Sequence, residues 1–140
     1  MRCRLLLVVA LAGVLLLAVA CKAGAPQRAI RVPCDELEKE KKISRTLEVQ
    51  AGGSFTVSLC SNPTTGFSWE EAAIGDASVL GQTGRKTETP QSQALGAAGQ
   101  EVWTFKALKP GKTTVSIAYS RPWQGGEKGV WTFDLSVTVK

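Results

Sequence analysis

Apolar and polar residues alternate along most of the chain beyond residue 43, with the period of two that describes a β-strand with one buried face. The clearest case is the last segment, in which Thr132, Asp134 and Ser136 separate apolar neighbours. The same period predicts strands over residues 54–60, 67–70, 100–108, 113–119 and 131–139, with weaker ones near residues 44–49, 78–80 and 82–88.

Turn-forming residues separate these predicted strands, and no stretch beyond the first twenty residues repeats its apolar positions with the helical period. About seven short strands in roughly 100 residues predict an all-β domain, an immunoglobulin-like two-sheet β-sandwich over residues 43–140. A closed barrel is the alternative architecture. The turns are Ala51-Gly52-Gly53, Asn62-Pro63, Lys109-Pro110-Gly111 and Gln124-Gly125-Gly126.

Residues 1–20 have the pattern of an export signal, because Arg2 and Arg4 precede an unbroken apolar run that is short for a membrane span. Small residues stand directly before Cys21, as in a bacterial lipobox, where the cysteine thiol is acylated. We therefore expect a lipoprotein-type signal peptide, lipidation of Cys21, and export to the periplasm or cell surface as a membrane-anchored lipoprotein. Because Ala18 is weaker than the leucine usual at that place, cleavage without lipid is the alternative.

Residues 21–42 are expected to form a tether and an N-terminal extension. Gly24 and Pro26 interrupt a segment with little periodicity, which is typical of a linker. The folded domain is expected to begin between Cys34 and Ile43.

Two cysteines, Cys34 and Cys60, remain once the leader is removed and the lipobox cysteine is acylated. Phe55, Val57 and Leu59 share one face of a predicted strand, which puts Cys60 on the opposite face, away from the apolar side. An exported protein lies in a compartment that permits disulfides. We therefore expect a Cys34–Cys60 disulfide, worth about 3 kcal/mol by chain entropy, rather than a buried free thiol.

Charge and composition argue against several classes of function. The mature chain keeps 15 basic and 12 acidic residues, a net charge of +3, which does not favour nucleic-acid binding. The sequence contains no histidine, which excludes Ser-His, Cys-His and histidine-ligated metal chemistry. With no Cys-x-x-Cys pair or carboxylate cluster in their place, we expect neither an enzyme nor a cofactor or metal site.

Residues 61–67, the threonine loop, join two predicted strands. The Asn62 side chain can cap a turn, Pro63 fixes the backbone after it, and Gly66 allows a conformation that other residues resist. We expect a stiff loop with Thr64 and Thr65 at its tip. Taken alone, the segment is also an ordinary turn.

Two further loops have unusual compositions. The tryptophan loop, residues 120–126, places Trp123 in a glycine-rich hairpin, either as an interface anchor or folded back over the sandwich end. The glycine loop, residues 95–99, has small side chains that would let another backbone approach, or that simply make a flexible hairpin. In a seven-stranded sandwich, all three loops are expected at one end.

These loops resemble the chagasin-type inhibitors of papain-family cysteine proteases, and the resemblance covers roughly residues 43–140. The threonine loop matches an Asn-Pro-Thr-Thr-Gly-aromatic motif, the tryptophan loop an Arg-Pro-Trp motif, and the glycine loop, more weakly, a glycine-rich third loop. Phe67 replaces the commoner tyrosine, and Ala98 stands where glycine is frequent. The implied protease-binding residues are Asn62, Pro63, Thr64, Thr65, Gly66, Phe67, Gly96, Ala97, Ala98, Gly99, Arg121, Pro122 and Trp123.

The resemblance implies a reversible, tight-binding protein inhibitor whose three loops block the active-site cleft of a papain-family cysteine protease. It implies that Thr64 and Thr65 cover the catalytic cysteine, with Trp123 and the glycine loop on either side of it. We expect the inhibitor to be a monomer. The alternative from a different class is a lipid-anchored adhesion or ligand-binding module, in which Trp123 would stack on a sugar or a partner surface.

Overall fold

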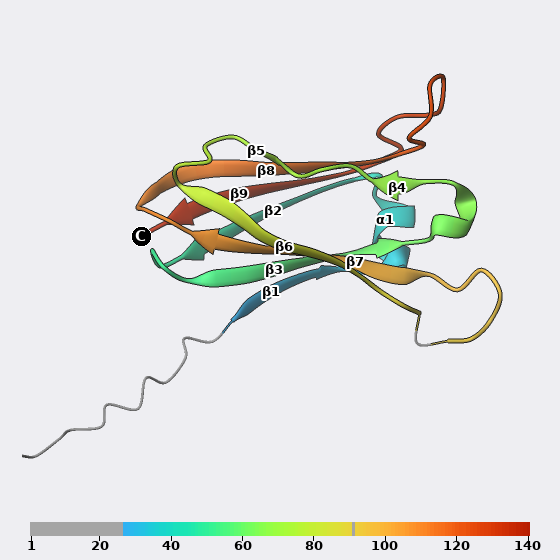
Figure 1. Cartoon of the computed structure of the whole chain (residues 1–140), viewed down its shortest axis with the longest axis horizontal. Helices are drawn as coiled ribbons and strands as arrows, with labels where there is room; N and C mark the ends of the chain where they lie inside the picture. The colour runs from blue at the N-terminus through green and yellow to red at the C-terminus, as the bar shows by residue number, and fades with distance from the viewer. Residues whose placement is uncertain (1–26, 91) are drawn as a thin grey trace, which may run out of the picture.

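Apolar side chains from alternate strand positions meet between two β-sheets in the computed structural model, which describes residues 27–90 and 92–140. Figure 1 shows how the strands of the two sheets are arranged. The first sheet contains, in spatial order, β1 (Arg28–Val32), β3 (Ser54–Ser61), β7 (Gly99–Ala107) and β6 (Leu80–Glu88). The second contains β2 (Lys42–Val49), β9 (Trp131–Val139), β8 (Gly111–Ser120) and β4 (Ser68–Trp69), with β5 (Ala73–Ile74) paired to β8. The expected two-sheet sandwich is confirmed, and the described strands do not close into a barrel.

Most neighbouring strands are antiparallel, but each sheet has one parallel pair. Strand β1 runs parallel to β3, and β2 runs parallel to β9 over its full length. The antiparallel β8–β9 hairpin extends from the Gly111–Val139 pair to the Tyr119–Trp131 pair. The tryptophan loop, which closes this hairpin, and the threonine loop between β3 and β4 lie at the same end of the sandwich (Figure 1).

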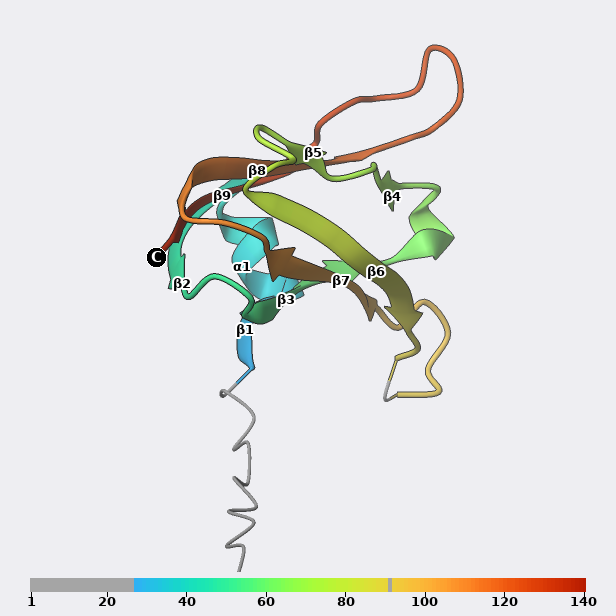
Figure 2. The same cartoon turned by 60° about the vertical axis from the view of Figure 1, so that its left-hand side comes forward.

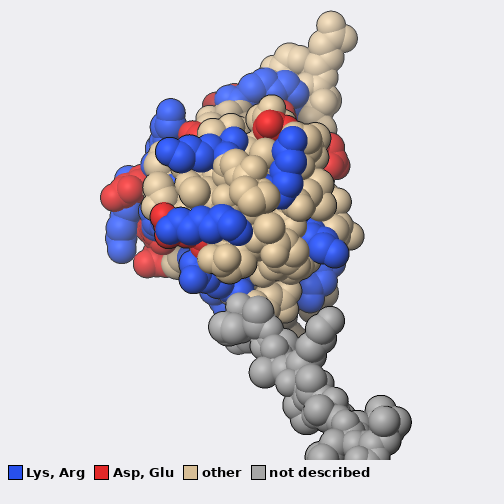
Figure 3. All heavy atoms as spheres, turned by 90° about the vertical axis from the view of Figure 1, so that its left-hand side faces the viewer, with Lys and Arg blue, Asp and Glu red and all other residues tan. Residues whose placement is uncertain are grey.

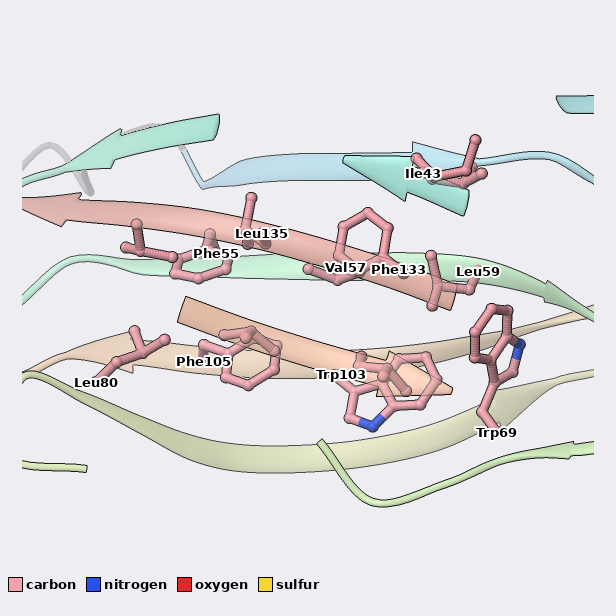
Figure 4. Packing of buried hydrophobic residues seen from close by; sticks show 14 of the residues in the cluster. Ile43, Phe55, Val57, Leu59, Trp69, Leu80, Trp103, Phe105, Phe133 and Leu135 are labelled. Carbon is pink, nitrogen blue, oxygen red and sulfur yellow. The ribbon is translucent and has the colours of Figure 1, made fainter. Parts of the chain in front are cut away.

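Large aromatic and aliphatic side chains fill the space between the sheets (Figure 4). Phe55 and Phe105 stack with ring centroids 5.3 Å apart, and Trp69 meets Trp103 edge to face at 6.3 Å. All four are at most 2% exposed. Burying a side chain of this size contributes about 1.5–3 kcal/mol, so the core holds the sheets that carry the loops in a fixed relation.

The fold begins at Arg28, earlier than the expected boundary between Cys34 and Ile43. Residues 28–32 form β1, an edge strand of the first sheet, and α1 (Cys34–Lys39) packs against β3. Leu37 of α1 is fully buried in the core. Sequence analysis did not predict β1 and α1, because a five-residue strand and a six-residue helix are too short to show a hydrophobic period.

The disulfide between Cys34 and Cys60 is present, with the two Cα atoms 5.0 Å apart, which confirms the expected pairing. Cys60 lies on the outer side of β3, as its parity predicted, yet it is only 1% exposed. Contacts between α1 and β3 explain this burial. The bridge thus fixes α1 against the end of β3 that leads into the threonine loop.

The predicted signal peptide and the predicted lipid site at Cys21 lie outside the described residues. Within residues 27–90 and 92–140, no helix has the length and apolar character needed to cross a membrane.

Candidate functional site

A one-turn helix at the tip shapes the threonine loop. The helix η1 (Pro63–Thr65) is capped by Asn62, whose Oδ1 accepts hydrogen bonds from the Thr64 backbone N–H at 3.3 Å and from the Thr64 hydroxyl at 2.6 Å. The Thr65 hydroxyl donates to the Asn62 carbonyl at 2.7 Å. Gly66 ends the turn with φ +79°, the left-handed conformation that favours glycine. The loop is stiff, as expected, and Pro63, Thr64 and Thr65 are exposed.

Asn62 also joins the threonine loop to the glycine loop. Its Nδ2 donates to the Gly96 carbonyl at 3.0 Å. On the core side, the Asn62 backbone N–H donates to the Tyr119 hydroxyl at 3.0 Å, and that hydroxyl also lies 3.3 Å from the Asn62 carbonyl. The loop base is therefore held from two directions, by a second loop and by a core aromatic residue.

The tryptophan loop lies against the threonine loop. A Cβ atom added to Gly66 would lie 2.9 Å from Cη2 of Trp123, so the indole ring contacts the glycine backbone directly. Trp123 nevertheless remains 51% exposed. Lys128 donates from Nζ to the Arg121 carbonyl at 2.5 Å and approaches the Trp123 carbonyl at 3.4 Å. The tryptophan is thus neither in the core nor free in solvent.

Arg121 lies between the two loops rather than at the tip. Its guanidinium is 4.4 Å from the centroid of the Phe67 ring, and its Nη1 is 3.4 Å from a Glu127 carboxylate oxygen. Phe67 in turn stacks on Tyr119 at 5.6 Å. A buried Arg121 Nε has no hydrogen-bond partner among the described residues. Arg121 therefore holds the tryptophan loop against the threonine loop through cation–π packing on Phe67.

The glycine loop connects β6 and β7 and reaches the same end of the molecule (Figure 1). Gly96 has φ +77° and an exposed backbone, and Ala98 is also exposed. Leu95 projects fully into solvent. Gly99 differs from its three neighbours, because it is buried as the first residue of β7, and an added Cβ would lie 2.3 Å from the Glu88 carbonyl. Gly99 is therefore required by strand packing, and the surface of this loop is residues 95–98.

The structure thus brings the three loops to one edge, where the threonine loop contacts both of the others directly. The proposed binding residues exposed there are Pro63, Thr64, Thr65, Gly96, Ala98, Pro122 and Trp123. Asn62, Gly66, Phe67, Ala97 and Arg121 are partly buried.

Comparison with known proteins identifies the family of the chain that carries these three loops. The model of the family described as "chagasin family peptidase inhibitor I42" matches residues 48–137, more than half of the chain. The chain belongs to the chagasin family of peptidase inhibitors. Amoebiasin-2 of Entamoeba histolytica is 31% identical over 101 residues, which cover 72% of this chain and 82% of that protein. Chagasin of Trypanosoma cruzi is 35% identical over 83 residues, covering 57% of this chain and 76% of chagasin.

Solved structures share the chagasin-family fold. The cysteine protease inhibitor EhICP2 of Entamoeba histolytica superposes with a TM-score of 0.62 at 21% identity, covering 83% of this chain and all of that one. PbICP-C, solved in complex with falcipain-2, gives a TM-score of 0.63 at 19% identity, covering 81% of this chain and 99% of that one. Members of this family are inhibitors, so the chain is a peptidase inhibitor and not an enzyme.

Sequence reasoning missed several residues that shape the chagasin-family edge. Tyr119 was predicted only as the last residue of the strand over residues 113–119, although its hydroxyl holds the threonine loop. Lys128 was not singled out, because a lysine beside a glutamate in a polar, glycine-rich segment carries no distinctive signal. The match to the family begins at residue 48, so β1, α1 and most of β2 lie outside it. Yet Glu38 and Lys41 line a hollow of about 540 Å³ that also borders Thr65.

Proposed function

We propose that this chain inhibits papain-family cysteine proteases by inserting the three loops into the active-site cleft. The observation that carries the proposal is the arrangement of Thr64, Thr65 and Trp123, which are exposed at one edge while their loops are fastened from behind. Membership of a peptidase-inhibitor family and a fold shared with an inhibitor solved in complex with falcipain-2 support the same partner.

The threonine loop would cover the catalytic cysteine without being cleaved. A substrate lies extended, so that its scissile carbonyl reaches both the nucleophile and the oxyanion donors. The peptide bonds of residues 63–65 are instead wound into a helical turn capped by Asn62. No carbonyl of this turn can take the extended attack geometry without breaking the hydrogen bonds of Asn62 and Thr65. The threonine loop therefore occupies the cleft as a plug and dissociates without being cleaved.

The other two loops would hold the plug in place. The half-exposed indole of Trp123 offers a large apolar surface suited to the wall of the cleft on one side. The exposed backbone of Gly96 and Ala98 would approach the other wall closely. An interface of standard size buries about 800 Å² on each partner. Because the loops are already ordered by their mutual contacts, little conformational entropy is lost on binding.

We also propose that the chain is exported and acts as a membrane-anchored monomer. The support is the apolar leader and the cysteine that follows Ala20. Cleavage before Cys21 and acylation of its thiol would leave the domain outside the cytoplasm, in the periplasm or at the cell surface. Mass spectrometry of the mature protein tests both steps, because lipid adds a mass that cleavage alone does not.

Titration of active papain with purified residues 22–140 tests the inhibitory function. A tight reversible inhibitor abolishes hydrolysis of a small peptide substrate at near-stoichiometric concentration, and activity returns on dilution. The inhibitor must also emerge uncut after a long incubation, as seen by gel electrophoresis and mass spectrometry. Full protease activity in a large excess of the folded domain would overturn the proposal and favour the adhesion or ligand-binding module.

A further inference from the structure

The chain enters the domain at the end opposite the three loops. Strand β1 begins at Arg28, which is opposite Phe55 near the start of β3, and both strands run toward the threonine loop. The C-terminal Lys140 lies at the same far end, next to the turn at residues 50–53 (Figure 2). Any anchor upstream of Arg28 therefore reaches the domain behind the loops and not beside them.

Basic side chains gather at this far end. Lys106, Lys109 and Lys112 come from the β7–β8 turn and its two flanking strands, and all three are exposed. None of them forms an ion pair with another residue of the described chain. Figure 3 looks directly at this end and shows Lys and Arg side chains spread across it. The end therefore carries a positive charge that the protein itself leaves largely uncompensated.

The acidic residues at this end offset only part of the charge. Glu48 pairs with Lys140 at 2.6 Å, and Arg28 donates to the Glu48 backbone carbonyl. Asp76 accepts hydrogen bonds from the backbone and hydroxyl of Ser78. Within residues 27–90 and 92–140, five basic side chains thus face two side-chain carboxylates here, and in a chain that ends at Lys140 the α-carboxylate adds a third negative charge.

An exposed apolar side chain lies among the lysines. Leu108 is 51% exposed, and its backbone N–H donates to the Val79 carbonyl at 2.8 Å, which fixes the tip of the turn. Lys109 follows it directly. A leucine flanked by lysines on a rigid tip suits the boundary of a lipid bilayer, where the apolar group enters the headgroup region and the ammonium groups meet phosphates.

We propose that this end, the basic tip of Arg28, Lys106, Leu108, Lys109, Lys112 and Lys140, docks on an anionic membrane surface. The inference rests on the proposed export and lipid attachment, which bring the domain to a bilayer. Docking through the basic tip points the three loops away from the lipid and toward proteases in the surrounding medium. The membrane surface and the protease then bind opposite ends of the sandwich at the same time.

Vesicle sedimentation tests the proposal with a mature chain, residues 21–140, that carries C21S and so cannot be acylated. We expect this protein to sediment with vesicles of mixed phosphatidylcholine and phosphatidylglycerol and to be released from them by salt. It should not bind vesicles of phosphatidylcholine alone. Each basic residue near a charged bilayer contributes about fivefold in affinity. The variant K106E/K109E/K112E loses three such residues and gains three repelling carboxylates, so it should bind anionic vesicles at least about a hundredfold more weakly.

A matched control reverses three lysines elsewhere, K39E/K42E/K86E, and gives the same net charge. We expect it to keep most of the vesicle binding, and both triple variants to inhibit papain like the parent. Equal loss in the two variants, or no binding of the parent to anionic vesicles, would overturn the proposal. Failure to inhibit papain would overturn the proposed function alone, because the sedimentation assay contains no protease.

Discussion

The Asn62 side-chain amide donates to the Gly96 carbonyl at 3.0 Å and so connects two loops that are 34 residues apart in sequence. The oxygen of the same carboxamide accepts from the Thr64 backbone N–H. One side chain therefore shapes the threonine loop with its oxygen and positions the glycine loop with its nitrogen. The two tasks can be separated by substitution, because a carboxylate keeps the acceptor and removes the donor.

Asn62→Asp should weaken papain inhibition about fivefold, which corresponds to the roughly 1 kcal/mol of one hydrogen bond. The cap on Thr64 persists, but a carboxylate oxygen now faces the Gly96 carbonyl and pushes the glycine loop away. Asn62→Ala should weaken inhibition further, since the cap is lost as well. The inhibition constants and the urea-unfolding free energies of both variants check this. Asn62→Asp inhibiting as well as the parent would show that the two loops need no link.

Whether the sequence predicted a feature of this site depends on how far apart in the chain the interacting residues lie. The stiffness of the threonine loop depends on neighbours within a few residues, Asn62, Pro63 and Gly66, so local turn chemistry was enough to predict it. The convergence of the loops followed from counting strands. The contact of Trp123 with Gly66 did not, because it joins residues that only the folded sandwich brings together.

Arg121 and Gly99 show that sequence motifs also do not reveal the role of a residue within a loop. Motif matching assigned both to the protease-binding set. The structure turns Arg121 back onto Phe67 and buries Gly99 against the Glu88 carbonyl. A motif records which residues a loop needs, and it does not separate those that touch a partner from those that shape the loop.

Trp123→Ala should weaken papain inhibition by about 2–4 kcal/mol, because the residue is a large exposed aromatic that anchors one side of the proposed interface. The melting temperature should change little, since the ring lies outside the core. Leu108→Ala is the matched control: Leu108 is also 51% exposed but lies at the opposite end. An unchanged inhibition constant for Trp123→Ala would remove this residue from the mechanism.

Thr65→Trp should abolish tight inhibition by placing a bulky ring at the tip that enters the cleft. Thr65 is exposed, so the domain should still fold, although the hydroxyl's hydrogen bonds to the Asn62 carbonyl and from the Phe67 backbone N–H are lost. Thr65→Ser keeps both bonds and should inhibit nearly as well as the parent. Circular dichroism confirms folding, and papain titration measures inhibition. Full inhibition by the tryptophan variant would contradict the plug geometry.

Removing the disulfide with Cys34→Ala and Cys60→Ala should lower the free energy of unfolding by about 3 kcal/mol, because the bridge closes a loop in the unfolded chain. Inhibition at 25 °C should change little. The Asn62–Gly96 hydrogen bond and the Trp123–Gly66 contact hold the loops without the bridge. Urea unfolding and papain titration measure the two effects separately. A large loss of inhibition in a folded variant would show that α1 or the bridge itself forms part of the interface.

The stability of the domain should be flat near neutral pH and fall in acid. The chain has no histidine, and two exposed carboxylates titrate below their ordinary values. The hydrogen bond from Lys140, followed by its charge, lowers the pKa of Glu48 from 4.5. Hydrogen bonds from the Ser78 hydroxyl and backbone lower the pKa of Asp76 from 3.8.

Because both pKa values are lower in the folded state, the unfolded chain binds more protons in acid, and stability is lost as pH falls through this range. Urea unfolding at about pH 7, 5.5 and 3.5 should therefore give equal free energies at the first two values and a lower one at the third. Glu48→Gln combined with Asp76→Asn should reduce the acid-dependent loss. A loss already present at about pH 5.5, or an equal loss in the double variant, would assign the acid sensitivity to other carboxylates.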